Sequence, residues 1–282
     1  MTWGLAVLLA VVQGLTEFLP VSSSGHLALL QNGVQRATGA TLPGALALDV
    51  LLHVGTLAAV VVYFRHDLVR LAAAALGEGT TPGSLTGPAS AADNGRRELA
   101  LMAVALLPTA VIGLALHNVV DQLLQRPRLV SGCIGATGLL LLLARPRGAP
   151  GRAGAHLPGW RQALLIGTAQ GLAVLPGLSR SGLTIATGLL VGLAPMAAFR
   201  WSFLLSIPVI AGAALLELLR PGADLSSLGW PAAGATLLAA AVGLVSLRLL
   251  ARSVARIHFH RFGWYCLTMA GLGLLLFTVW TA

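Results

Sequence analysis

Long apolar runs, separated by short stretches rich in arginine, proline and glycine, dominate the pattern of the chain. A spanning helix needs about 20 mostly apolar residues, and six runs are long enough to meet that need. These predicted spans are residues 44–65, 97–118, 128–145, 197–219, 230–250 and 263–281. The pattern therefore predicts an all-α polytopic membrane protein with six transmembrane helices.

Two further apolar segments, 3–33 and 160–193, are interrupted in the middle by serine, glycine and proline. The interruptions read LPVSSSGH at 19–26 and LPGLSRSG at 175–182. Inside a bilayer, non-helical backbone is tolerated only where protein or a wet cavity satisfies its polar groups. Both segments are therefore predicted to be re-entrant helix-loop-helix hairpins.

The two interrupted segments resemble each other. An ungapped alignment pairs Gln13 with Gln170, Gly14 with Gly171, Ser22 with Ser179, Ser24 with Ser181 and Gly25 with Gly182. Because three predicted spans follow each hairpin, the chain is predicted to hold two repeats, 1–145 and 160–282, within one integral membrane domain, 1–282. An odd number of spans per repeat inverts the second repeat and brings the two loops together near the midplane.

Composition agrees with this picture, since 56% of the residues are hydrophobic, 10% are charged and the mean hydropathy is +0.85. The net charge of +9 does not indicate nucleic-acid binding, because the basic residues lie in short loops between apolar runs. All 18 basic residues are arginine. This excludes chemistry that needs lysine, such as a Walker A phosphate loop or a Schiff base.

Arginine placement predicts the orientation of the bundle. One predicted side holds Arg36, Arg126, Arg128 and Arg220, whereas thirteen arginines fall on the other. By the positive-inside rule the second side is cytoplasmic, which leaves both termini outside. The apolar run 3–12 has no charged residue before it and is expected to be retained rather than cleaved as a signal peptide.

Few ionisable residues fall at bilayer depth, where each costs about 2.5–3.5 kcal/mol. They are Glu17, His26, Asp49, His53, Arg180 and Glu217. Gln13 and Glu17 share one helix face directed at the first loop. The Glu17 carboxylate suits a hard cation or proton transfer, or a structural hydrogen bond to the serine-rich turn.

The first loop offers three hydroxyls, Ser22, Ser23 and Ser24, followed by Gly25 and His26. A hydroxyl beside a base is typical of covalent phosphoryl transfer, although serine-rich turns also simply satisfy backbone groups. We predict Ser23 as the nucleophile and His26 as its base. Direct attack by His26, or by water that it activates, is the alternative.

The second loop places Arg180 between Ser179 and Ser181, where a guanidinium fork and two hydroxyls suit a phosphate oxyanion. Gly182 and Thr184 open the next half-helix, whose first N–H groups also favour an anion. A structural ion pair between Arg180 and Glu17 is the alternative, and both roles are compatible in a resting enzyme.

Three further ionisable residues and the two cysteines have simpler interpretations. Asp49 and His53, four residues apart, either support the site from behind or form an interfacial pair. Glu217 is interpreted as an interfacial ion pair with Arg220, and Cys133 and Cys266 as buried thiols.

These motifs resemble the undecaprenyl-diphosphatase family, also called bacitracin-resistance proteins. The likeness lies in QGLTEFLPVSSSGH at 13–26 and PGLSRSGLT at 176–184, with further similarity at 51–57 and 202–208. It implies hydrolysis of undecaprenyl diphosphate to the monophosphate, the recycling step that supplies lipid carrier for peptidoglycan synthesis. It also implies a bacterial inner-membrane protein whose active site opens to the periplasm.

The resemblance also implies a site and its partners. Glu17, Ser23, His26 and Arg180 match the family's functional positions, and a divalent cation, Mg²⁺ or Ca²⁺, is expected at Glu17 and Gln13, where glutamine replaces the family's first acidic residue. Substrate-binding residues are expected to be Gln13, Ser22, Ser24, Gly25, Ser179, Ser181, Gly182 and Thr184. The expected partners are a polyprenyl diphosphate, the lipid bilayer and a second copy in a homodimer.

Two other functions compete with this interpretation. Inverted repeats with broken helices also build lipid flippases and secondary transporters. A type 2 phosphatidic acid phosphatase shares the Ser-Gly-His and Ser-Arg pairs, but that family needs an upstream lysine and a second histidine after the arginine. The chain has no lysine, and the next histidine after Arg180 is His258.

Overall fold

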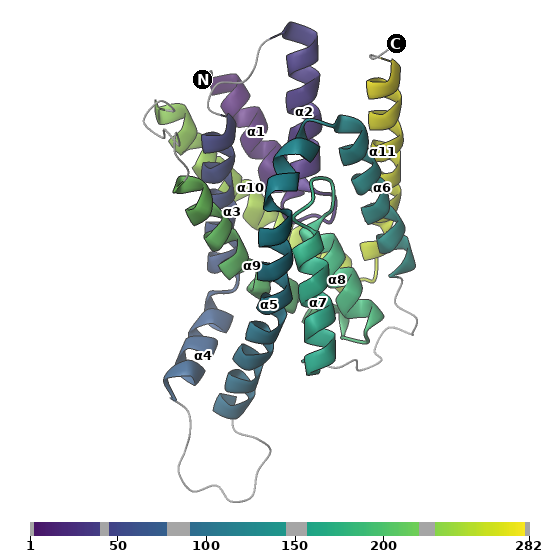
Figure 1. Cartoon of the computed structure of the whole chain (residues 1–282). Helices are drawn as coiled ribbons and strands as arrows, with labels where there is room; N and C mark the ends of the chain where they lie inside the picture. The colour runs from purple at the N-terminus through teal and green to yellow at the C-terminus, as the bar shows by residue number, and fades with distance from the viewer. Residues whose placement is uncertain (1–2, 40–44, 78–90, 145–156, 220–228, 280–282) are drawn as a thin grey trace, which may run out of the picture.

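The computed structural model describes residues 3–39, 45–77, 91–144, 157–219 and 229–279, and all of their regular structure is helical (Figure 1). The first half holds α1 (Trp3–Thr16), α2 (Ser23–Thr38), α3 (Ala45–Tyr63), α4 (Arg65–Leu76), α5 (Ala91–Leu124) and α6 (Pro127–Leu143). The second half holds α7 (Trp160–Leu172), α8 (Arg180–Leu190), α9 (Pro195–Leu218), α10 (Gly229–Ala255), the 3-10 turn η2 (Phe259–Arg261) and α11 (Phe262–Val279).

Four helical stretches within the described residues are long and apolar enough to cross a bilayer: Asn94–Val120, Pro195–Leu218, Gly229–Ala255 and Phe259–Val279. A fifth candidate is the bent pair of α3 and α4, and α6 is apolar but only 17 residues long. Each of the six predicted spans coincides with one of these helices. The chain is therefore a helical membrane protein.

Helix α4 is an element that the apolar pattern did not predict. The chain bends by 75° between α3 and α4, at Phe64, without a proline or glycine at the break. The Phe64 ring is buried against Phe199 and Phe203 of α9, with ring centroids 5.8 and 6.1 Å apart. Aromatic packing and polar contacts of α4, rather than a local breaker, therefore account for the bend.

An ion network holds the polar face of α4 against its neighbours. The Arg200 guanidinium on α9 donates to Asp67 of α4 at 2.6 Å and to Glu98 of α5 at 2.5 Å. Arg70 of α4 donates to the second oxygen of Glu98 at 2.5 Å. Glu98 is 2% exposed, so its charge depends on both arginines.

The two broken segments enter the bundle from opposite ends, and their loops meet in its middle (Figure 1). Helix α1 packs on α10, and α7 packs on α5. The loops touch through glycine: a Cβ on Gly25 would lie 3.0 Å from the Gly177 Cα. Gly177 has φ +96°, a conformation that favours glycine. A side chain at Gly25 would therefore push the two loops apart, whereas one at Gly177 would meet Val130 and Cys133 of α6.

Phe18 anchors the first loop in the core. Its ring is fully buried and packs edge-on against Phe203 of α9, with centroids 5.6 Å apart. Gly243 of α10 leaves room for this ring, because a Cβ there would lie 2.6 Å from Phe18 Cε2. The residue before Phe18, Glu17, is thereby held at a fixed depth between the two halves of the chain.

Candidate active site

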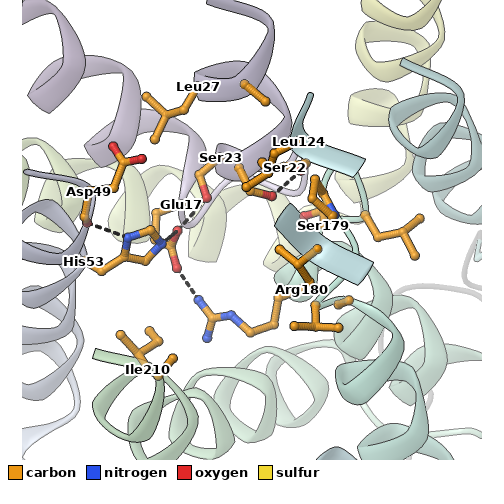
Figure 2. Close-up of a pocket in the computed structure, with 18 of the residues that line it drawn as sticks. Glu17, Ser22, Ser23, Leu27, Asp49, His53, Leu124, Ser179, Arg180 and Ile210 are labelled. Atoms are coloured by element: carbon orange, nitrogen blue, oxygen red, sulfur yellow. Dashed lines mark hydrogen bonds and ion pairs between the residues drawn. The ribbon is translucent and has the colours of Figure 1, made fainter. Parts of the chain in front are cut away.

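Glu17 is the centre of the site. Its carboxylate is buried, and Ser23 donates to Oε2 at 2.6 Å and Arg180 to Oε1 at 2.5 Å (Figure 2). The Gln13 amide also donates to Oε2, at 3.1 Å. Glu17 and Ser23 belong to the first broken segment, and Arg180 begins α8 in the second. The structure therefore brings together three of the four residues predicted to be catalytic.

A cavity of about 320 Å³ opens beside these groups. Its polar wall consists of Glu17, Ser22, Ser23, Ser24, Gln31, Asp49, His53, Ser179, Arg180 and Glu217. Its apolar wall comes mainly from α5 and α9, through Val120, Leu124, Val209, Ile210, Ala213 and Ala214. A charged end joined to an apolar wall suits an amphiphilic ligand with a polar head group.

Serine N-caps set the geometry of both loops. Ser22 Oγ accepts a hydrogen bond from Gly25 N, and Ser179 Oγ accepts one from Gly182 N, each at 3.1 Å. Ser23 and Arg180 are therefore the first residues of α2 and α8. Both helices begin at the cavity, so their N-terminal dipoles add positive potential where Arg180 already lies.

His26, which was predicted to be the base for Ser23, does not lie on the wall of this cavity. Its Nδ1 is 2.7 Å from the Ser22 carbonyl oxygen, and its Nε2 is 2.8 Å from the Tyr265 hydroxyl. The ring lines a separate apolar cavity between α1, α2 and α11. Both ring nitrogens of His26 are therefore bonded to residues other than Ser23.

His53 is the imidazole that faces Glu17. Its Nε2 lies 3.6 Å from Glu17 Oε2, and its Nδ1 lies 2.7 Å from the Asp49 carbonyl oxygen (Figure 2). The carbonyl can only accept, so Nδ1 carries a hydrogen. The Asp49 carboxylate accepts a 3.4 Å bond from Gln31. Of the two roles left open for Asp49 and His53, the geometry therefore favours support of the site.

Several predicted substrate-binding residues stand behind the cavity wall rather than on it. Ser22, Ser24 and Ser179 line the cavity, whereas Gln13, Gly25, Ser181, Gly182 and Thr184 do not. The second group packs or hydrogen-bonds the loops: Thr184 donates to the Arg180 carbonyl at 2.7 Å, and Ser181 lies 3.3 Å from Ser179 Oγ. In the structure these residues make contacts within and around the two loops.

Sequence reasoning missed Thr137 and the apolar wall of the cavity. The Thr137 hydroxyl on α6 accepts from Ser179 N at 3.1 Å and is 3.2 Å from the Gly177 carbonyl oxygen, which ties the second loop to α6. A threonine inside an apolar run carries no signal of such a role. Glu217 lies on the cavity wall, and its predicted partner Arg220 lies outside the described residues.

Comparison with known proteins identifies the family of this chain. Residues 6–272 match the family model described as bacitracin resistance protein BacA. A protein named undecaprenyl-diphosphatase from Syntrophotalea carbinolica is 41% identical, over 95% of this chain and 96% of its own. Proteins of the same name from Rubrobacter xylanophilus, 41% identical over 95% of both chains, and Korarchaeum cryptofilum, 38% identical over 96% and 97%, match equally broadly. The chain belongs to the bacitracin resistance protein BacA family.

Proposed function

We propose that the chain hydrolyses undecaprenyl diphosphate to undecaprenyl phosphate and inorganic phosphate. The observation that carries this proposal is the convergence of Ser23 and Arg180 on the buried Glu17 carboxylate, beside a cavity with one apolar wall. The relatives named undecaprenyl-diphosphatase support the choice of substrate. By releasing carrier lipid for another round of cell-wall synthesis, this activity gives resistance to bacitracin.

Ser23 is the nucleophile in this mechanism, and Glu17 replaces His26 as its base. The Ser23 hydroxyl already donates to Glu17 Oε2 at 2.6 Å, which is the direction in which its proton must leave. As Ser23 Oγ bonds to the terminal phosphorus, the phosphoanhydride bond breaks and undecaprenyl phosphate departs. The departing undecaprenyl phosphate takes up the proton from Glu17. Water then cleaves the phosphoserine as Glu17 accepts a proton from that water and returns it to Ser23 Oγ, which releases inorganic phosphate.

Arg180 and the two helix N-termini bind the diphosphate. A guanidinium forms paired hydrogen bonds with phosphate oxygens. The Arg180 side chain is only 15% exposed, so water competes weakly with a phosphate for these bonds. Ser179 and Ser24 lie on the same wall and offer hydroxyl donors. Phosphoryl transfer depends mainly on such positioning and charge stabilisation.

The apolar wall from α5 and α9 receives the first isoprene units of the substrate. Leu124, Val209 and Ile210 line the same cavity as Arg180, so a head group bound there leaves its chain against these side chains. Burial of this chain stabilises binding by about 25 cal/mol for each Å² removed from water.

Within the cavity, the carboxylates of Glu17 and Asp49 suit a divalent cation better than the Gln13 amide does. Gln13 turns its amide nitrogen to Glu17, and the described residues contain no group of three His, Cys, Asp or Glu placed to hold a metal alone. Mg²⁺ is usually held by one or two carboxylates together with substrate phosphates. Asp49 Oδ1, which is buried without a hydrogen-bond partner in the described structure, and Glu17 are the carboxylates for such a site.

Charge balance also supports a cation. Among the described residues, the carboxylates of Glu17 and Asp49 line the cavity beside the guanidinium of Arg180. A diphosphate entering this cavity adds further negative charge in a region of low dielectric. A bound Mg²⁺ or Ca²⁺ would supply the charge neutralisation that the described side chains lack.

Six spans, two re-entrant hairpins and an inverted repeat complete the proposed architecture. Its support is the equivalence of aligned residues: a Cβ on Gly14 would lie 2.8 Å from Val242 Cβ of α10, and one on Gly171 would lie 2.8 Å from Ile112 Cβ of α5. Ser22 and Ser179 make the same N-cap bond. Matching helix contacts and caps are what two copies of one unit produce.

The proposed orientation places both termini and the mouth of the cavity in the periplasm of a bacterial inner membrane. The start of α1 and the end of α11 lie at the same end of the bundle (Figure 1). Arg36 stacks over Phe277 at 5.3 Å, and Arg128 donates to the Phe277 carbonyl at 3.0 Å, at that end. The cytoplasmic end then holds the network of Arg70, Arg200 and Glu98.

Phosphate release by purified protein in detergent tests the function. With a synthetic polyprenyl diphosphate and Mg²⁺ or Ca²⁺, the wild type should release inorganic phosphate, and Ser23→Ala or Arg180→Ala should reduce release to background. Ser246→Ala is the matched control, because Ser246 is buried on α10 and bonds to the Val242 carbonyl, away from the cavity. Since detergent abolishes any gradient, a wild type that releases no phosphate would favour the flippase or transporter interpretation.

A further inference from the structure

We propose that His26 and Tyr265 are positioning residues that hold Ser22 in a left-handed backbone conformation and thereby direct the Ser23 hydroxyl at Glu17. The inference rests on the proposed function for the role of Ser23. A positioning role would explain why His26 is present although it lies outside the Glu17 cavity.

Both ring nitrogens of His26 are occupied in the structure. The Ser22 carbonyl can only accept, so Nδ1 carries the hydrogen and donates across 2.7 Å. In the neutral ring Nε2 then accepts from the Tyr265 hydroxyl, 2.8 Å away. The two rings lie nearly parallel, with an interplanar angle of 7° and centroids 5.7 Å apart. His26 therefore has no free lone pair with which to take a proton from Ser23.

The carbonyl that His26 holds belongs to a residue in an unfavourable conformation. Ser22 has φ 72° and ψ 99°, a region that residues with a Cβ rarely adopt. Its oxygen accepts two bonds from one residue, the backbone N–H of His26 at 3.2 Å and the imidazole at 2.7 Å. Together they fix the peptide that joins Ser22 to Ser23.

The orientation of that peptide decides where Ser23 lies. Ser22 caps α2 through Gly25 N, so Ser23 is the first helical residue and its hydroxyl reaches Glu17 Oε2 at 2.6 Å. Rotation of the Ser22 backbone toward an ordinary conformation would move the start of α2 and carry Ser23 with it. Tyr265, on α11, supports the imidazole from outside the hairpin and opposes this rotation.

Three substitutions separate positioning from catalysis. His26→Ala removes the bond to Ser22, and misplacement of a reactive group by about 1 Å costs about 100-fold in rate, so kcat should fall by that order while KM changes little. His26→Asn places an amide N–H near the position of Nδ1 and should recover activity to within about tenfold of wild type, although asparagine cannot act as a base. Tyr265→Phe should give a smaller loss, and its pH–rate profile should keep the shape of the wild type.

Hydrogen exchange of the peptide covering 19–28 gives a readout that does not depend on turnover. The amides of Gly25 and His26 both bond to Ser22, so they should exchange faster in His26→Ala and Tyr265→Phe than in wild type. Tyr63→Phe, the change at the other tyrosine of the chain, should leave this peptide unchanged.

The outcomes distinguish the inference from the function beneath it. If His26→Asn folds but is as inactive as His26→Ala, or if the exchange of 19–28 is unchanged in His26→Ala, the positioning role is refuted while the phosphatase assignment stands. If the wild type releases no phosphate, the proposed function fails. Faster hydrogen exchange of the peptide 19–28 in His26→Ala would then support only the structural claim that His26 fixes the Ser22 carbonyl.

Discussion

Replacing Glu17 by glutamine removes the proposed base while keeping the shape of the side chain. Arg180 only donates, so the new amide must turn its oxygen to Arg180 and its NH₂ group to Ser23. The Ser23 hydroxyl would then accept a hydrogen bond instead of donating one. Gln13 can adapt by rotating its own amide, because its Oε1 is buried without a partner in the described structure.

The size of the effect follows from the role of the lost group. A positioned general base contributes about 10²–10⁴-fold to a rate, which corresponds to about 3–5 kcal/mol of barrier. We therefore expect kcat for phosphate release by Glu17→Gln to fall by that factor, measured under saturating polyprenyl diphosphate in detergent. Substrate affinity should change less, because Arg180 and the serines of the cavity remain.

Glu98→Gln is the matched control for the loss of a buried carboxylate. Glu98 also accepts from two side chains, Arg70 and Arg200, but it lies outside the cavity. This variant should unfold at a lower temperature than wild type, since removing one member of a buried ion network is costly, yet its folded fraction should keep the wild-type kcat. Equal kcat losses in the two variants, or a Glu17→Gln enzyme within threefold of wild type, would refute the assignment of Glu17 as base.

Three further outcomes are expected. His53→Leu should lower kcat by only about fivefold, because a partly exposed pair at 3.6 Å contributes at most about 1 kcal/mol; a complete loss in the phosphate assay would contradict this supporting role. Gly167→Ala should destabilise the fold by about 1–3 kcal/mol or more in thermal unfolding, because its Cβ would meet the Ala105 carbonyl of α5, whereas Gly113→Ala, with open space around it, should be neutral or slightly stabilising. Chelation of divalent cations should stop phosphate release and added Mg²⁺ should restore it; undiminished release in excess chelator would exclude the proposed cation.

The apolar pattern predicted most of the helices because run length alone decides whether a helix can cross a bilayer. The breaks in the hairpins were also predicted, since proline and serine interrupt the runs there. Helix α4 was not predicted, because the 75° bend at Phe64 depends on aromatic contacts with α9 and on ion pairs with residues far along the chain. Six spans, the re-entrant character of the two broken segments, the repeat and a homodimer stay predictions.

The sequence also predicted which residues meet at the site better than it predicted where they point. Glu17, Ser23 and Arg180 meet as expected, because the two loops carry the few polar groups at bilayer depth. The direction of His26 is set by Tyr265, which is 239 residues away in an apolar run and shows no local signal. The positive φ of Ser22 could not be predicted from the sequence either, because such a conformation usually occurs at glycine.

Glu17 and Arg180 stand 163 positions apart, and in the resting molecule each neutralises the other. In the resting molecule this ion pair keeps both side chains engaged with each other. An ion-paired carboxylate is a weaker base, so the proposed mechanism predicts slow reaction of Ser23 with other lipids while Glu17 and Arg180 stay paired. A diphosphate that binds Arg180 would displace the Glu17 carboxylate and leave it free to take the Ser23 proton. The proposed mechanism would therefore favour substrates whose negative charge is high enough to break this ion pair.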